Sequence, residues 1–186
     1  MLPRNVPVLL RDRSLLLPMG EPGGSFFLKT ADHGKTWTRS APIAGGGQPT
    51  LARLPDGSLL ALMRRTPRIL QSVSRDGGLS WTAAAPTSLR NPDAGIALTH
   101  LRNGYLVLVF NDSETARTPL SIARSVDGGR TWESPLLLEA NPGEYSYPSV
   151  IQGSDGRIHV TYTFRRYAIK HVEMDESWLT RLERPN

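Results

Sequence analysis

"SVDGGRTW", residues 125–132, is the stretch that decides the fold, because its pattern occurs more than once. "TADHGKTW" (residues 30–37) and "SRDGGLSW" (residues 74–81) share it: Ser or Thr, Asp two residues later, Gly two after that and Trp three further on. A worn fourth copy, "VEMDESW", covers residues 172–178. Each copy ends on one of the four tryptophans of the chain, which are spaced by roughly 44–51 residues. A period of that length is typical of propeller blades or of helical repeats.

The segments between these boxes favour strands over helices. Each contains an apolar run of alternating character, such as "SLLALMRR", "YLVLVFND" or "RIHVTYTF", directly after a short turn. The turns carry Asp-Gly or Asn-Gly at residues 55–57, 102–104 and 154–156. Short runs of period two with such turns indicate antiparallel strands joined as hairpins. The sequence therefore predicts an all-β chain in which each repeat is a four-stranded blade of a β-propeller.

We expect one domain over residues 1–186, with repeats at approximately 1–44, 45–90, 91–140 and 141–186.

Composition excludes several other classes of protein. There is no cysteine, so disulfides and thiolate metal sites are absent, and no apolar run approaches the roughly 18 residues of a membrane span. The net charge of +5 is scattered, without the basic tract that nucleic-acid binding favours. The start of the chain has no signal-peptide pattern, and the compartment stays open.

The four histidines show no spacing typical of metal ligands, so we expect neither a metal nor another cofactor. They are His33, His100, His159 and His171.

The boxes themselves are expected to be structural. Their aspartates, Asp32, Asp76 and Asp127, can accept hydrogen bonds from turn amides, and their glycines tolerate positive φ. Antiparallel geometry places the boxes and the Asp-Gly turns on one face of the propeller. Chemistry is therefore expected on the opposite face, where first strands begin and second strands end near the central channel.

Polar residues collect at the positions that this face should contain. At the starts of first strands they are Gln48, Asn91, Asp93, Glu144, Tyr145 and Tyr147. At the ends of second strands they are Arg64, Arg65, Asn111, Asp112, Arg165 and Arg166. Arginine forks grip carboxylates and phosphates, so an anionic partner is one interpretation and ordinary solvated loop residues are the other.

The three boxes, together with "EYSYPSVIQGSDGRIHVTYTFRR" near the end, resemble the Asp-box (BNR repeat) sialidase or neuraminidase family, and the last segment resembles its bacterial sialidase-like branch. The resemblance implies a six-bladed propeller of which this chain holds about four blades from the C-terminal portion. It implies a glycoside hydrolase that removes terminal sialic acid with a tyrosine nucleophile, an assisting glutamate, an aspartate acid/base and three arginines that clamp the substrate carboxylate.

Carried onto this sequence, the resemblance makes Tyr147 the first candidate for the nucleophile and Tyr145 its rival. Alternation along a strand would place both on one face. Arg64 and Arg165 or Arg166 match positions of the family's arginines, and Gln48, Asn91, Asp93, Asn111 and Glu144 are further candidates for substrate binding. The assisting glutamate comes from another blade in the family, so Glu144 is given a binding or local role.

The family's first arginine and its acid/base aspartate lie in opening blades that this chain is expected to lack. The activity of the chain alone then stays open, and either the missing blades or self-association would cover its open sheets. Two alternatives stay open beside a sialidase of terminal sialic acids. One is a carbohydrate-binding Asp-box propeller without catalysis, and the other is a propeller enzyme that acts on another acidic sugar.

Overall fold

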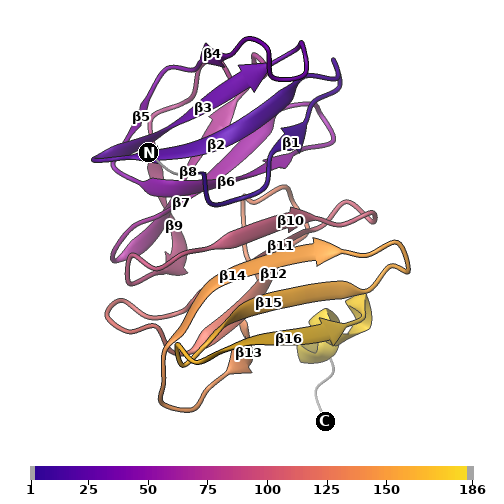
Figure 1. Cartoon of the computed structure of the whole chain (residues 1–186). Helices are drawn as coiled ribbons and strands as arrows, with labels where there is room; N and C mark the ends of the chain where they lie inside the picture. The colour runs from indigo at the N-terminus through magenta and orange to yellow at the C-terminus, as the bar shows by residue number, and fades with distance from the viewer. Residues whose placement is uncertain (1–2, 184–186) are drawn as a thin grey trace.

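The computed structural model describes residues 3–183 and consists of four antiparallel sheets followed by a 3-10 helix (Figure 1). The first sheet holds β1 (Val8–Leu9), β2 (Leu15–Glu21), β3 (Gly24–Thr30), β4 (Thr38–Arg39) and β5 (Ile43–Ala44). The second holds β6 (Gly47–Arg53), β7 (Leu59–Arg64), β8 (Arg68–Ser74) and β9 (Ala85–Arg90). The third holds β10 (Ala97–His100), β11 (Leu106–Asn111), β12 (Leu120–Ser125) and β13 (Leu136–Glu139). The fourth holds β14 (Tyr145–Gln152), β15 (Ile158–Phe164) and β16 (Ala168–Met174), and η1 (Glu176–Glu183) follows.

Consecutive sheets pack face to face through three apolar clusters, one at each junction. The inner strand β6 contacts both β2 and β10, and β10 in turn contacts β14. Every residue of β11 and β12 is buried, because the third sheet has a neighbour on both faces. This stacking of antiparallel sheets along their inner strands is the β-propeller that the repeats predict, with four blades in the chain.

The boxes hold turns together, as expected, and they also pack against the neighbouring blade. Asp127 accepts hydrogen bonds from the amide of Thr131 at 2.9 Å and from its hydroxyl at 2.7 Å. The ring of Trp81, at the end of the second box, packs on Phe27 of the first blade with centroids 4.3 Å apart. The box aspartates therefore act in structure, on the face away from the candidate chemistry.

The two end blades depart from the four-stranded expectation. The first sheet has five strands, because β3 pairs with both β4 and β5. Within the described residues the fourth sheet has three strands, and Trp178 lies in η1 instead of starting a fourth strand. The reason is local: Asp175 accepts a hydrogen bond from the amide of Trp178 at 2.9 Å, so it caps a helical turn where the complete boxes make a glycine turn.

Within residues 3–183, no helix is both long enough and apolar enough to cross a membrane.

Candidate functional site

Three consecutive blades begin at their inner strands with a residue in the left-handed backbone region. The φ angles are 44° at Gln48, 59° at Asp93 and 52° at Tyr147. Gln48 and Tyr147 sit at irregularities in the pairing of β6 and β14, and each precedes a proline. A residue with a side chain is held in this region at a cost of about 1–2 kcal/mol, and such strain gathers at functional sites. The three positions mark the face that carries the candidate site.

Tyr147 is half exposed, at 50%, and two arginines lie beside its ring. The guanidinium carbon of Arg4 lies 5.4 Å from the ring centroid, and that of Arg117 lies 5.3 Å from it. Distances of this order allow cation–π attraction and keep both cations beside the phenol. Tyr147 is therefore an accessible phenol in a positively charged surrounding.

Arg4 belongs to the segment before β1, and its side chain reaches residues at the beginning of the inner strands of the third and fourth blades. It donates to the carbonyl oxygen of Ile96 at 2.7 Å and to that of Pro148 at 3.1 Å. A Cβ at Gly95 would lie 2.7 Å from its guanidinium carbon, so the close passage of Arg4 requires glycine there. Burial and the nearby Arg64 lower the pKa of Arg4 to about 10, which leaves it protonated at neutral pH. Arg4 thus brings a partly desolvated positive charge to the site.

Glu144 binds Arg117 and one further arginine, Arg166. It accepts from Arg166 Nε at 2.6 Å and from Arg117 Nη1 at 3.2 Å, and the hydroxyl of Ser146 donates to it at 2.8 Å. The hydrogen bond from Arg166, followed by that from Ser146, lowers the pKa of this carboxyl group. Glu144 is therefore an anion at neutral pH that positions cations.

Arg64 ends β7 and forms an ion pair with Asp93, with Nε and Oδ1 3.5 Å apart. That separation is too long for a good hydrogen bond, and Arg64 Nε is buried without a hydrogen-bond partner in the described chain. Both side chains line a cavity of about 190 Å³, whose lining also includes five glycines from the first two blades. Arg4 Nε and Gln48 Oε1 are likewise buried without partners. Such groups normally bind a protein group or water, so this face has spare capacity for a polar ligand.

Four of the sequence candidates lie apart from this group. Tyr145 is fully buried, and its hydroxyl donates to the carbonyl oxygen of Asn141 at 3.1 Å. Asn91 and Asn111 are also fully buried and bond to backbone groups. Arg165 directs its guanidinium over Phe164, 5.3 Å from the ring centroid.

The expectation that Tyr145 and Tyr147 share a face is wrong. The pairing of β14 with β15 shifts between Ser146 and Ser149, and this bulge breaks the alternation. The inner tyrosine enters the core, where Tyr162 and Phe164 surround it, and the outer one turns to solvent.

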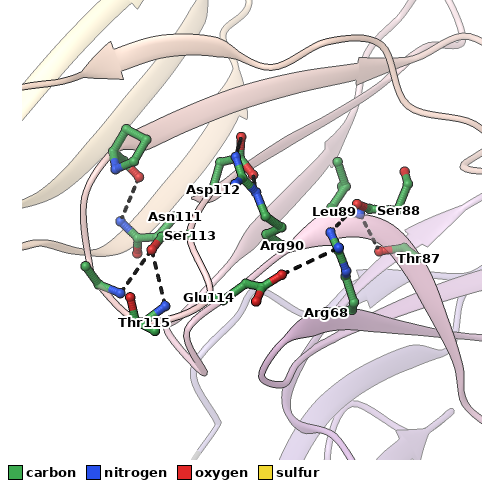
Figure 2. A network of polar contacts seen from close by, with 12 residues as sticks. Arg68, Thr87, Ser88, Leu89, Arg90, Asn111, Asp112, Ser113, Glu114 and Thr115 are labelled. Carbon is green, nitrogen blue, oxygen red and sulfur yellow. Dashed lines mark hydrogen bonds and ion pairs between the residues drawn. The ribbon is translucent and has the colours of Figure 1, made fainter.

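Sequence reasoning missed Arg4 and Arg117. Arg4 stands just before the first strand of the first repeat, and Arg117 lies in the loop between the second and third strands of the third repeat. The same positional rule that selected Gln48 and Arg64 would have found both. Figure 2 shows how the loop after β11 is anchored: Asp112 accepts two hydrogen bonds from Arg90, at 2.9 and 3.1 Å. Arg68 reaches Glu114 at 3.5 Å, so the loop that carries Arg117 is tied to the second blade.

The fold and the site together define a class of protein. It is an Asp-box propeller that has an exposed tyrosine among arginines where its inner strands begin. The chain belongs to the BNR repeat-like domain family, whose profile matches residues 1–160. It is 28% identical over 166 residues to a curated protein named sialidase from Micromonospora viridifaciens, covering 80% of this chain and 25% of that protein. The chain thus spans about a quarter of its curated relative.

Solved structures share the fold. A Hadza microbial sialidase, Hz136, has a TM-score of 0.80 at 23% identity, over 92% of this chain and 37% of its own. The NanB sialidase from Streptococcus pneumoniae has a TM-score of 0.79 at 16% identity, over 92% of this chain and 30% of its own. The chain thus shares the propeller fold of these sialidases.

Proposed function

We propose that this chain carries the tyrosine and the arginine clamp of a sialidase-type site, which takes a terminal sialic acid or a similar acidic sugar. The observation that carries the proposal is the exposed Tyr147 phenol between the guanidinium groups of Arg4 and Arg117. The similarity to one curated protein named sialidase supports the choice of sugar. Arg64 and Arg166 supply two further guanidinium groups, each held by a carboxylate, Asp93 and Glu144 respectively.

The chemistry suits these residue types. A guanidinium binds a carboxylate through charge-assisted hydrogen bonds, so arginines can fix the sugar by its acid group. Sialidases use a tyrosine nucleophile, because the substrate's own carboxylate on the anomeric carbon would repel a second anion. In the proposed reaction the Tyr147 oxygen loses its proton and attacks that carbon, while the glycosidic bond breaks and the leaving oxygen takes up a proton to become an alcohol. Water then adds to the same carbon, breaks its bond to the tyrosine oxygen and returns a proton to the phenol.

A second candidate is binding of the acidic sugar without hydrolysis. Within residues 3–183, the hydrogen bonds of the Glu144 carboxylate come from Arg117, Ser146 and Arg166 and none comes from the Tyr147 hydroxyl, whose proton a base would have to take. Glu144 is held as an anion by arginine and is a poor proton donor. These observations favour a recognition site unless groups outside the described residues complete the catalytic set.

The experiment measures both properties on the full chain: hydrolysis of a fluorogenic sialoside, and binding of a methyl sialoside by calorimetry. Tyr147→Phe is the test variant, and Tyr167→Phe is the matched control because Tyr167 is exposed on the β15–β16 turn. Hydrolysis that is lost only in Tyr147→Phe supports the enzyme. Binding without hydrolysis in the wild type supports the second candidate, and absence of both refutes the proposal.

A further inference from the structure

The outer face of the last blade brings two histidines and a glutamate together at the pairing of β15 with β16. His159 lies directly opposite Glu173, and His171 is opposite Thr161, one row along. Residues two apart on a strand share a face, so all three side chains project from the same side of the sheet. His171 and Glu173 are exposed and His159 is half-buried. The Asp-Gly turn at residues 154–156 flanks this cluster, toward the opposite end of the sheet from Tyr147.

The donor atoms have the separations that one cation needs. His159 Nδ1 and His171 Nε2 are 3.1 Å apart, and Glu173 Oε2 lies 3.8 Å from His159 Nδ1. One ligand atom from each residue lies within 4.8 Å of the other two. Two imidazole nitrogens that each bind Zn²⁺ at about 2.0–2.1 Å in tetrahedral geometry are roughly 3.3 Å apart. The observed nitrogen pair is therefore within a few tenths of an ångström of the separation that one ion requires.

The surrounding groups suit such a site. Asp155 Oδ1 lies 3.9 Å from His159 Nε2, the ring nitrogen left over when Nδ1 binds a metal, and ligating histidines usually donate that second N–H to a carboxylate. Arg157 pairs with the other carboxylate oxygen of Glu173, Oε1, and so orients Oε2 toward the histidines. The ligands stand on paired strands, which hold their spacing better than a loop would.

We propose that His159, His171 and Glu173 form a binding site for a first-row divalent cation, with Zn²⁺ as the ion that fits best. Two imidazoles and a carboxylate suit Zn²⁺, whereas Ca²⁺ and Mg²⁺ prefer all-oxygen sites. Three protein ligands leave one tetrahedral position open to water or to a group from a partner. The site is independent of the sugar site, because it shares no residue with it.

The alternative is a plain imidazole pair. The two rings are stacked, with centroids 5.3 Å apart and planes 7° from parallel, and one nitrogen can simply donate a hydrogen bond to the other. A metal site requires that the cation bind at this pair and depend on Glu173. A hydrogen-bonded pair requires neither.

Calorimetric titration of the metal-free full chain with ZnCl₂, beside CaCl₂ and MgCl₂, tests the proposal. We expect one Zn²⁺ per chain, its loss in His171→Ala and weaker binding in Glu173→Gln. Asp155→Asn should weaken binding roughly tenfold or more. His33→Ala is the matched control, because His33 is an exposed histidine in the first box. The absorption spectrum of Co²⁺ in the same variants reports a tetrahedral site independently of heat.

Because the substituted ligands are at the surface, circular dichroism should show folded variants. Zn²⁺ binding that is absent in the wild type, that persists in His171→Ala, or that falls equally in His33→Ala would overturn the proposal.

Discussion

Gly129→Ala tests whether the boxes fasten neighbouring blades. Gly129 has φ +87°, and a Cβ there would lie 2.5 Å from Leu60 Cδ2 in the second blade. The left-handed backbone costs an alanine about 1–2 kcal/mol. The contact adds about 1–3 kcal/mol, because Leu60 is buried and has little room to move. We expect a loss of about 2–5 kcal/mol, a large share of the 5–15 kcal/mol by which ordinary domains are stable.

Gly104→Ala is the matched control for this prediction. Gly104 also has a positive φ, +93°, but a Cβ there would meet nothing within 4 Å. Gly104→Ala should therefore lower the free energy of unfolding only by the cost of the left-handed backbone, about 1–2 kcal/mol. Urea unfolding, followed by circular dichroism, measures the stability lost in both variants. The loss is given by the shift in the urea midpoint, provided that the dependence of the unfolding free energy on urea concentration stays the same.

Equal losses in the two glycine variants would refute the fastening role of the box. As a further check, Leu60→Val removes the Cδ2 atom that Gly129→Ala would strike. In that background the penalty of Gly129→Ala should shrink toward that of Gly104→Ala, because the two sites are then no longer coupled through the clash.

Arg4→Met should weaken methyl sialoside binding by roughly tenfold to a hundredfold, the usual contribution of one hydrogen bond to a charged group. Arg102→Met, on the opposite face, should leave the affinity unchanged. Equal affinities of the two variants in calorimetry would contradict the arginine clamp. Hydrogen bonds within the first box lower the pKa of Asp32 from 3.8 to about 2, first that from the hydroxyl of Thr36. The stabilisation that ionised Asp32 contributes is therefore complete above about pH 4 and is lost as the pH falls toward 2. The melting temperature of Asp32→Asn should accordingly depend less on pH over that interval than that of the wild type. Tyr145→Phe should cost about 1 kcal/mol of stability and leave sialoside affinity intact, with melting and calorimetry as the paired measurements. A Tyr145→Phe variant that binds less tightly at full stability would place Tyr145 in the site instead.

The sequence predicted the fold well because its signals are local. The spacing of Asp, Gly and Trp in the boxes reflects one turn, and the alternating runs reflect the two-residue period of a strand. Both repeat along the chain, so the repeats predict stacked antiparallel blades. The same signals fail at the last box, "VEMDESW", where the glycines are absent and Asp175 caps η1 instead.

The candidate site was only partly predictable. Position in a blade selected the face that gathers Tyr147, Glu144 and Arg64, and the same rule could have added Arg4 and Arg117. It could not separate Tyr147 from Tyr145, because strand alternation assigns them the same face. A bulge in β14 reverses that assignment, and the bulge depends on the pairing with β15.

The sequence by itself thus determined the blades, the structural role of the box aspartates and the face that carries the candidate site. Those features arise from contacts between residues close in the chain. Tertiary structure alone decided which tyrosine is exposed, that Arg4 crosses to the third and fourth blades, and that His159 meets His171 twelve residues away. Each of these depends on how strands and blades pack, and residue spacing does not encode the distance between two packed elements.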